Sequence, residues 1–299
     1  KDDYDLINAH GSPSEWIRNN NPRVCWYCYS PNREAYDLHD FRMKQLSLPK
    51  RILNSGILSA FKAAEGPAVR KIEKIVAISE ITNARIKKYL HRDDAEVIPP
   101  GINEKEFYCE DYKKYFFYPS RIVPEKRFEY AIGAFREFCR NAPAKGWKLV
   151  IAGFLLDKES DRAYAQKLRE LCAGLDVEFR FNPSDAELKK MYANCSASLF
   201  CAMNEDWGLI PIESMASSKP CISVNEGGPV YTIVNKETGF LVNSQSEMAE
   251  KMIFLAEHPD ECKKMGKSGR KRVLQNYTWG VFFEKLGAAF KETARGKLE

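Results

Sequence analysis

The stretch SLFCAMNEDWGLIPIESMASSKPCISV, residues 198–224, decides the fold. The apolar run at 198–202 is typical of a buried strand, and a polar turn follows it as far as Gly208. A short helix is expected next, with Pro211 in its first turn, and Lys219-Pro220 ends it. A second strand-like run follows at 221–224. A strand, a helix and a strand in this order form a βαβ unit with parallel strands.

The same alternation extends along most of the chain in both directions. The strand-like runs are DLINAH, VCWYC, EKIVAIS, AEVIP, FFYPSR, WKLVIAG, VEFRFN, SASLFCA, PCISVN and GFLV. Helical patterns lie between them, clearest at 80–90, 128–140, 162–173 and 184–193. This order predicts the α/β class, with doubly wound parallel sheets and helices on both faces.

A Pro-Pro-Gly sequence within IPPGINEKEFYCEDYKKY, residues 98–115, separates two series of strands. A chain of 299 residues has the length of about two domains. We predict a partial N-terminal domain at 1–110, a complete six-stranded domain at 111–278, and a C-terminal helix at 279–299 that returns towards the N-terminal domain. The first domain is expected to be incomplete, because no glycine-rich turn follows an opening strand.

The composition is that of a soluble globular protein, with 44% hydrophobic and 29% charged residues. It excludes collagen-like, wholly disordered and disulfide-scaffold classes. No run approaches the ~20 apolar residues of a membrane-spanning helix, and the first residues have no signal-peptide pattern. With nine scattered cysteines, this predicts a cytoplasmic protein with reduced thiols. Cys25 and Cys28 are expected to be core residues rather than zinc or redox ligands, and no metal site is predicted.

Positive charge is concentrated between Arg42 and Lys74. Eight lysines and arginines stand there against Glu65 and Glu73, a local excess of +6 beside a net charge of +5 for the whole chain. Leucines and isoleucines interleave with them, which suits either an amphipathic segment on an anionic membrane surface or a core helix with a solvated basic face. Nucleic acid is not an expected partner, because no basic patch is interleaved with exposed aromatic residues.

The start of the helix after Gly208 has the features of an anion site. The free amides of Gly208, Leu209 and Ile210 lie at the positive end of the helix dipole and would bind a diphosphate. Glu213 would then accept hydrogen bonds from diol hydroxyls beside that diphosphate. The alternative is that Glu205 is a loop charge and Glu213 an ordinary acid of the first turn.

A complementary pair of cations follows the strand FFYPS. In PSRIVPEKR, Arg121 and Lys126 lie five residues apart, and ligands of open α/β sheets bind where strands end. Two cations there would neutralise a leaving diphosphate. The alternative is that both are ordinary surface charges.

Taken in order, these motifs resemble glycosyltransferase family 4, whose GT-B fold has two Rossmann-like domains. The similar motifs are Arg121-x4-Lys126, Glu205-x7-Glu213, Gly227-Gly228-Pro229 and TGFLV at 238–242, supported by VAISEITNARIKKYL, VIPPGINEKEF and NYTWGVFFEKL. The resemblance covers nearly the whole chain but lacks the family's opening strand and glycine-rich loop. In addition, Tyr29 and Tyr231 replace a histidine and an acidic residue that are common in the family.

The resemblance implies metal-independent transfer of a hexose from a nucleoside diphosphate sugar, with retention of anomeric configuration. It assigns Arg121 and Lys126 to the diphosphate, and Glu213 to the ribose. Gly208 to Ile210 would bind the phosphate and the sugar, and Glu205 the donor sugar.

His10 matches the histidine that family members place beside the reacting sugar, although a lone histidine is more often structural. Base recognition is expected from the loop Phe181 to Asp185, in which Asp185 would either contact a guanine edge or cap the following helix.

The donor implied is a GDP- or UDP-sugar, used as a substrate without any cofactor. Mannose is favoured, because WYCYSPNREAYD is similar to members that transfer mannose, and glucose is the alternative. The acceptor would be a glycan or a lipid-linked glycan at the cytoplasmic face of a membrane. Two other hypotheses remain open, a nucleotide-sugar epimerase of the same fold and a non-catalytic nucleotide-sugar-binding module.

Overall fold

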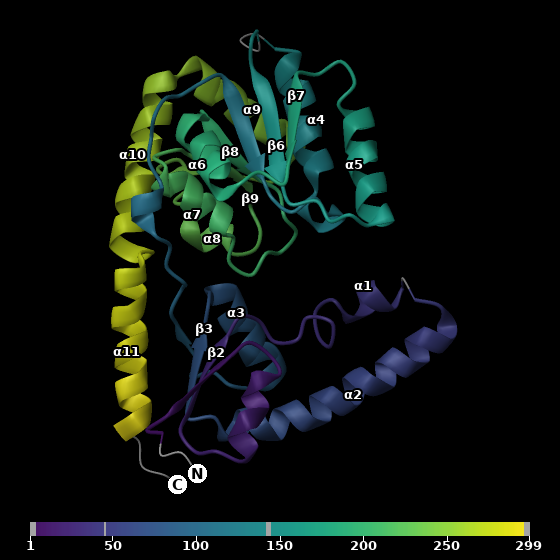
Figure 1. The fold of residues 1–299 in the computed structure, drawn as a ribbon, viewed down its shortest axis with the longest axis vertical. Helices are drawn as coiled ribbons and strands as arrows, with labels where there is room; N and C mark the ends of the chain where they lie inside the picture. Colours follow the sequence, from purple (N-terminus) through teal and green to yellow (C-terminus); the bar gives the residue numbers. More distant parts are fainter. Residues whose placement is uncertain (1–3, 45, 142–144, 296–299) are drawn as a thin grey trace. The chain divides into compact units, whose positions relative to one another are not determined.

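The computed structural model describes residues 4–44, 46–141 and 145–295 of the chain. The chain divides into two compact units (Figure 1). Unit 1 comprises Lys1–Pro100 with Gly280–Glu299, and unit 2 comprises Gly101–Trp279. The boundary expected after residue 110 therefore falls inside unit 2. The reason is that the amides of Glu110 and Asp111 both donate to the Ala193 carbonyl, which fixes this segment to unit 2.

Unit 1 is built on a parallel four-stranded sheet of order β1-β2-β3-β4, and each strand-like run predicted there forms a strand. The strands are β1 (Ile7–His10), β2 (Val24–Cys28), β3 (Lys74–Ala77) and β4 (Glu96–Val97). The helices are η1 (Ser14–Asn19), α1 (His39–Met43), α2 (Leu48–Lys71), α3 (Glu80–Arg85), the π-helix η2 (Ile86–Leu90) and α11 (Trp279–Arg295). Trp26, Val69 and Ile75 are fully buried in its core.

The last helix, α11, packs against the sheet of unit 1. The ring of Phe282 meets Tyr27 of β2 edge-on, with the two ring centroids 5.7 Å apart. Lys74 of β3 donates a 2.7 Å hydrogen bond to Glu292. Helix α11 therefore packs against β2 and β3 of unit 1, although it is far from both strands in the sequence.

The basic stretch forms α2, whose first half is exposed almost all round, apolar side chains included. Leu48, Ile52, Leu53 and Ile57 are 55–70% exposed. Further along, α2 contacts the rest of unit 1, because the Phe61 ring lies 5.4 Å from that of Trp16 and the Lys62 ammonium lies over the Tyr36 ring. The expectation of a core helix is therefore wrong for residues 48–57, since their apolar side chains have no core to cover. It holds only near the end of α2, where Ala68 and Val69 are buried.

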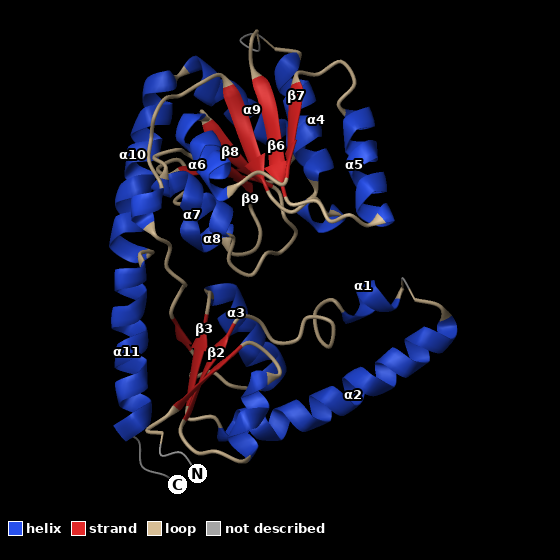
Figure 2. Ribbon diagram, in the orientation of Figure 1, coloured by secondary structure: helices blue, strands red, loops and turns tan. Residues whose placement is uncertain are grey.

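Unit 2 contains a parallel six-stranded sheet of order β10-β9-β8-β5-β6-β7. The sequence predicts the six strands, and Figure 2 shows strands of this sheet among the helices of the unit. The strands are β5 (Tyr115–Pro119), β6 (Lys148–Gly153), β7 (Val177–Phe181), β8 (Ala197–Phe200), β9 (Cys221–Val224) and β10 (Gly239–Val242). The helices are η3 (Glu104–Glu106), η4 (Pro124–Lys126), α4 (Phe128–Cys139), α5 (Glu159–Leu171), α6 (Asp185–Asn194), α7 (Leu209–Ala216), α8 (Pro229–Thr232), α9 (Gln245–Glu257) and α10 (Pro259–Asn276).

Helices cover both faces of this sheet, which confirms the doubly wound α/β class. Phe116 and Phe117 are neighbours in β5 and point to opposite faces. Phe116 packs against Phe138 of α4, whereas Phe117 meets Tyr192 of α6 edge-on. No helix in the described part of the chain is long and apolar enough to span a membrane.

The strand order of unit 2 reverses at β5. The chain runs from β5 outward to β6 and β7, then returns to β8 on the other side of β5 and continues to β9 and β10. The loops that follow β5 and β8 therefore leave the sheet in opposite directions, and a crevice opens between them. Ligands of doubly wound sheets bind at this topological switch point.

Candidate functional site

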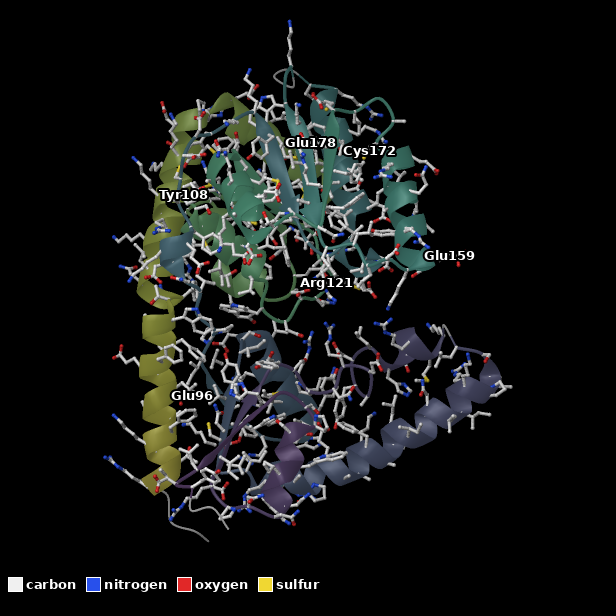
Figure 3. All side chains as sticks on the ribbon, viewed as in Figure 1. Glu96, Tyr108, Arg121, Glu159, Cys172 and Glu178 are labelled. Atoms are coloured by element: carbon white, nitrogen blue, oxygen red, sulfur yellow. The ribbon has the colours of Figure 1, made fainter. Side chains whose placement is uncertain are left out.

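A cavity of about 400 Å³ lies at the carboxyl ends of the strands of unit 2. The ends of two strands and the segments that follow three strands line it: Pro119–Arg121 at the end of β5, Ala152–Phe154 at the end of β6, and Asn182, Pro183 and Asp185 after β7. Leu188 of α6 and the first residues of α7, Leu209, Ile210 and Glu213, complete the lining. The structure thus brings Arg121, Asp185 and Glu213 together from segments far apart in the sequence. Figure 3 shows Arg121 in the loops beyond the sheet.

The cavity wall depends on a close approach between two loops. A Cβ atom at Gly153 would lie 1.6 Å from the Ser120 carbonyl oxygen, so only glycine fits there. The loops after β5 and β6 can therefore lie against each other beside Arg121.

Glu213 lies in α7 and is held by a tyrosine that the sequence analysis did not identify. The hydroxyl of Tyr192, a fully buried residue of α6, donates a 2.7 Å hydrogen bond to Glu213 Oε2. Burial raises the pKa of the Glu213 carboxyl, and the bond from Tyr192 opposes that rise. The bond fixes one carboxylate oxygen and leaves the other to accept a hydroxyl from the cavity.

The first turn of α7 presents free amides to the cavity, because it begins at Gly208 without a side-chain cap. Gly208 has φ +82°, a conformation that L side chains rarely adopt. The helix dipole adds positive potential at this end, so the amides before Glu213 form an anion-binding turn.

The Gly227-Gly228-Pro229 turn lies directly against the loop that leads into α7. The Gly228 amide donates to the Glu205 carbonyl at 2.8 Å. A Cβ atom at Gly228 would lie 2.2 Å from the Trp207 carbonyl oxygen, and one at Gly227 would lie 2.7 Å from the Glu205 amide nitrogen. The two glycines are therefore needed for the two loops to touch.

Lys126 and Glu205 form an ion pair of 2.6 Å, although they are 79 residues apart. The Lys126 side chain is 11% exposed and that of Glu205 is 35% exposed. Neither lines the 400 Å³ cavity, but Glu205 precedes Gly208 by three residues and so lies at the entrance to α7. The pair places a cation and a carboxylate, both predicted as functional, in direct contact.

Of the two residues predicted to recognise the base, one lines the cavity and the other does not. Asp185 lines the cavity but does not cap α6, because Ser184 is the cap and forms a capping box with Glu187. Phe181 does not line this cavity. It packs beside Phe179 against the core, and the Arg169 guanidinium lies over its ring.

A larger groove of about 880 Å³ lies on the face of β6 and β7 that α6 leaves uncovered. Lys148, Glu178 and Arg180 line it, all on the strands themselves, and Glu178 is paired with Arg180. Of the predicted donor-binding residues it includes only Phe181. The smaller cavity is therefore the better candidate site, since the strand ends and the start of α7 converge on it.

His10 ends β1 in unit 1. Its Nδ1 lies 3.0 Å from the Tyr29 hydroxyl and its Nε2 lies 2.7 Å from the Asn8 side-chain nitrogen. Burial lowers the pKa of the imidazole and so favours its neutral form. Tyr29, which replaces a common family histidine, is thus the partner that orients His10.

The two cysteines of β2 are fully buried free thiols, and burial raises the pKa of both. In residues 4–44, 46–141 and 145–295, no group of three or more histidine, cysteine or acidic side chains is placed to hold a metal ion.

The curated sequences to which this chain is similar include a sucrose-phosphate synthase and a mannosyltransferase. The chain is 31% identical over 200 residues to a probable sucrose-phosphate synthase of Thermosipho melanesiensis, which covers 63% of this chain and 45% of that protein. It is 23% identical over 308 residues to alpha-1,3/1,6-mannosyltransferase ALG2 of Dictyostelium discoideum, with 91% and 71% coverage. The chain thus spans about half the length of the first relative and about seven tenths of the second.

Two solved structures show the same fold. Sucrose-phosphate synthase of Thermosynechococcus elongatus superposes with a TM-score of 0.78 at 21% identity, covering 97% of this chain and 73% of that one. HepE of Anabaena in complex with UDP gives 0.77 at 15% identity, covering 97% and 79%. The predicted GT-B fold is confirmed.

The sequence profile described as "Glycosyl transferases group 1" matches residues 103–272, more than half of the chain. This match includes every cavity-lining residue and the Lys126–Glu205 pair. The chain belongs to the group 1 glycosyltransferases.

Proposed function

We propose that this chain binds a nucleoside diphosphate hexose in unit 2 and takes part in transfer of the hexose, with retention of anomeric configuration, to a glycan or lipid-linked acceptor. The observation that carries the proposal is the cavity at the switch point, where a cation, a partly buried carboxylate and a free helix start converge. These three groups match two parts of such a donor, its diphosphate and its ribose. The diphosphate needs positive charge, and the ribose diol needs an acceptor.

Arg121 and the amides of Leu209 and Ile210 would hold the diphosphate. An arginine fork gives two parallel hydrogen bonds to phosphate oxygens, and the helix dipole adds a field that needs no proton transfer. Lys126 would supply a second positive charge when the diphosphate leaves. Together these groups provide the electrostatic stabilisation without a metal ion.

Glu213 would accept hydrogen bonds from the ribose hydroxyls, with its second oxygen held by Tyr192. Glu205 would bind hydroxyls of the transferred hexose through the oxygen that Lys126 does not occupy. Asp185 lies where it would contact the base and would favour guanine, whose N1–H and N2–H₂ donors suit a carboxylate.

Mannose is the favoured hexose, because the Dictyostelium relative, which matches 91% of this chain, is named as a mannosyltransferase. Glucose is the alternative, supported by the HepE complex with UDP-glucose. For His10 we propose a contact with a sugar hydroxyl, since a neutral imidazole is able to accept a hydrogen bond.

We further propose that α2 rests on an anionic membrane surface at the cytoplasmic face. Between Arg42 and Lys62 the sequence contains five basic residues and no acidic ones. The same segment carries the exposed apolar side chains of α2. A helix with an exposed apolar side and basic flanks suits the interface of a bilayer with anionic lipids.

The test of the proposed function is titration of the chain with nucleotides and their sugar conjugates, followed by analysis of the products. Free nucleoside diphosphate with a new glycoside supports transfer. An epimeric nucleotide sugar, or binding without any product, would support one of the two other hypotheses instead.

A further inference from the structure

The loop at 201–208 connects β8 to α7 and carries Glu205. The carbonyl groups of Cys201 and Ala202 begin this loop, beyond the last strand residue, Phe200. One side chain bonds both of them. The Arg127 guanidinium donates to Cys201 O through Nε at 2.5 Å and to Ala202 O through Nη2 at 3.3 Å.

The same guanidinium also joins the loop to the glycine turn. Arg127 forms an ion pair with Glu226, the residue before Gly227. The Gly228 amide in turn donates to the Glu205 carbonyl. Arg127 therefore holds the beginning of the loop directly, and it also anchors the turn that holds the middle of the loop.

The backbone at Arg127 is arranged for this contact. Arg127 has φ +50° and ψ +50°, the left-handed conformation, which is uncommon for a residue other than glycine. This turn lets consecutive side chains serve two partners, since Lys126 pairs with Glu205 while Arg127 reaches the loop carbonyls.

Backbone contacts fix the turn in the same place. The hydroxyl of Tyr118, a fully buried residue, donates to the Lys126 carbonyl and accepts the Cys201 amide at 3.1 Å. The Met203 amide donates to the Glu125 carbonyl at 3.1 Å. Segments 125–127 and 201–203 therefore form one connected unit, to which Arg127 adds a charged side chain that bonds the Cys201 and Ala202 carbonyls.

We propose that Arg127 is a positioning residue that fixes the 201–208 loop so that Glu205 is held ready for the transferred hexose. This inference rests on the proposed function and deepens it. Arg127 does not line the 400 Å³ cavity, whose Arg121, Asp185 and Glu213 come from other loops and from α7. Arg127 should therefore affect recognition of the hexose far more than recognition of the nucleoside diphosphate.

The experiment compares the affinity for a nucleotide sugar with that for its nucleoside diphosphate. GDP-mannose and GDP, and UDP-glucose and UDP, are titrated by calorimetry into the unaltered chain and into Arg127→Met and Arg127→Lys. Arg127→Met should weaken binding of the nucleotide sugar about tenfold, the effect of losing roughly one charge-assisted hydrogen bond. Binding of the nucleoside diphosphate should change by less than about threefold.

Arg127→Lys should give an intermediate loss, because an ammonium cannot bond two carbonyls and a carboxylate in the fixed geometry of the guanidinium. Glu226→Gln should reproduce part of the loss. Arg136→Met is the matched control, since Arg136 also donates to a backbone carbonyl in unit 2, that of Leu171, but lies on α4 away from the loop. The control should leave unchanged the affinity ratio, which is the affinity for the nucleotide sugar divided by that for its nucleoside diphosphate.

A folded Arg127→Met or Arg127→Lys chain with an unchanged affinity ratio would overturn the positioning role and leave the proposed function standing. Equal losses for the sugar conjugate and the diphosphate would do the same. If the unaltered chain binds neither ligand, the proposed function fails, and this inference fails with it. Circular dichroism melting shows which variants are folded, and Arg127→Lys provides the test if the methionine variant is not.

Discussion

The hydroxyl of Tyr192 in α6 donates a 2.7 Å hydrogen bond to Glu213 in α7. This bond joins the helix that follows β7 to the helix that follows β8, so it crosses the switch point of the sheet. It also gives the partly buried carboxylate one fixed partner inside the protein. The proposed nucleotide site therefore depends on a residue that itself does not line the cavity.

Tyr192→Phe should weaken binding of a nucleoside diphosphate about fivefold, because it removes one hydrogen bond worth ~1 kcal/mol and keeps the ring. The ring is needed, since it packs against Phe107 and Phe117. Calorimetric titration measures the change. Tyr164→Phe is a suitable control, because that hydroxyl bonds Glu129 on the other face of the sheet. Equal affinities for Tyr192→Phe and the unaltered chain would show that the bond does not orient Glu213.

Gly228→Ala should strongly weaken nucleotide-sugar binding and destabilise unit 2 by roughly 1–3 kcal/mol. The added Cβ would lie 2.2 Å from the Trp207 carbonyl and would push the glycine turn away from the 205–208 loop. Gly287→Ala is the matched control, since a Cβ atom there meets nothing within 4 Å in the middle of α11. It should stabilise the chain by about 0.5–1 kcal/mol. Urea unfolding of both variants measures the expected loss and gain of stability. A Gly228→Ala chain that is as stable as the unaltered chain would contradict the close contact.

The stability of unit 1 should fall as the pH rises from about 4.5 to about 7. Glu15 is fully buried, and burial raises its carboxyl pKa from 4.5 to about 7. Within that window the folded chain keeps a proton that the unfolded chain releases, so the free energy of unfolding decreases with pH and levels off above pH 7. The whole change is at most about 3 kcal/mol.

Glu15→Gln should remove most of this pH dependence and make the chain more stable than the unaltered one at pH 8. Glu34→Gln, a substitution at an exposed glutamate of the same unit, should keep the dependence. Thermal melts between pH 4.5 and 8 measure both. A Glu15→Gln chain that is as pH-dependent as the unaltered chain would rule out Glu15 as the source.

Replacing Leu48, Ile52, Leu53 and Ile57 of α2 by glutamine should abolish binding to vesicles that contain phosphatidylglycerol. These side chains are exposed, so the variant should fold normally. Co-sedimentation with phosphatidylglycerol and with phosphatidylcholine vesicles measures the effect, and only the anionic vesicles should bind the unaltered chain.

The control for this membrane test replaces Leu156 and Leu274, two exposed leucines of unit 2, by glutamine. It should retain vesicle binding. If the unaltered chain does not bind anionic vesicles, or forms a dimer by light scattering that the α2 variant loses, the apolar side of α2 serves protein association instead.

The sequence predicts the sheets well because their signals are local. Apolar runs such as those of β5 and β8 mark buried strands, and the Ser184 capping box marks the start of α6. The order of strands then places Arg121 and Glu213 at one edge, because parallel strands end on the same side.

The rest of the site is set by contacts between distant segments. The left-handed backbone of Arg127 and the bond from Tyr192 have no local pattern, since nothing in EKR or KKMYAN differs from an ordinary turn or helix. The exposure of Leu53 in α2 was equally hidden, because periodicity shows which side of a helix is apolar but not what covers it.

The most direct test of the nucleotide site is calorimetric titration of this chain with GDP, UDP and ADP, with and without a chelator, beside the Glu213→Ala variant. We predict that one nucleotide binds selectively, that the chelator has no effect, and that folded Glu213→Ala binds it at least about tenfold more weakly. Equal affinity of Glu213→Ala and the unaltered chain, or no binding of any nucleotide by the unaltered chain, would contradict the account.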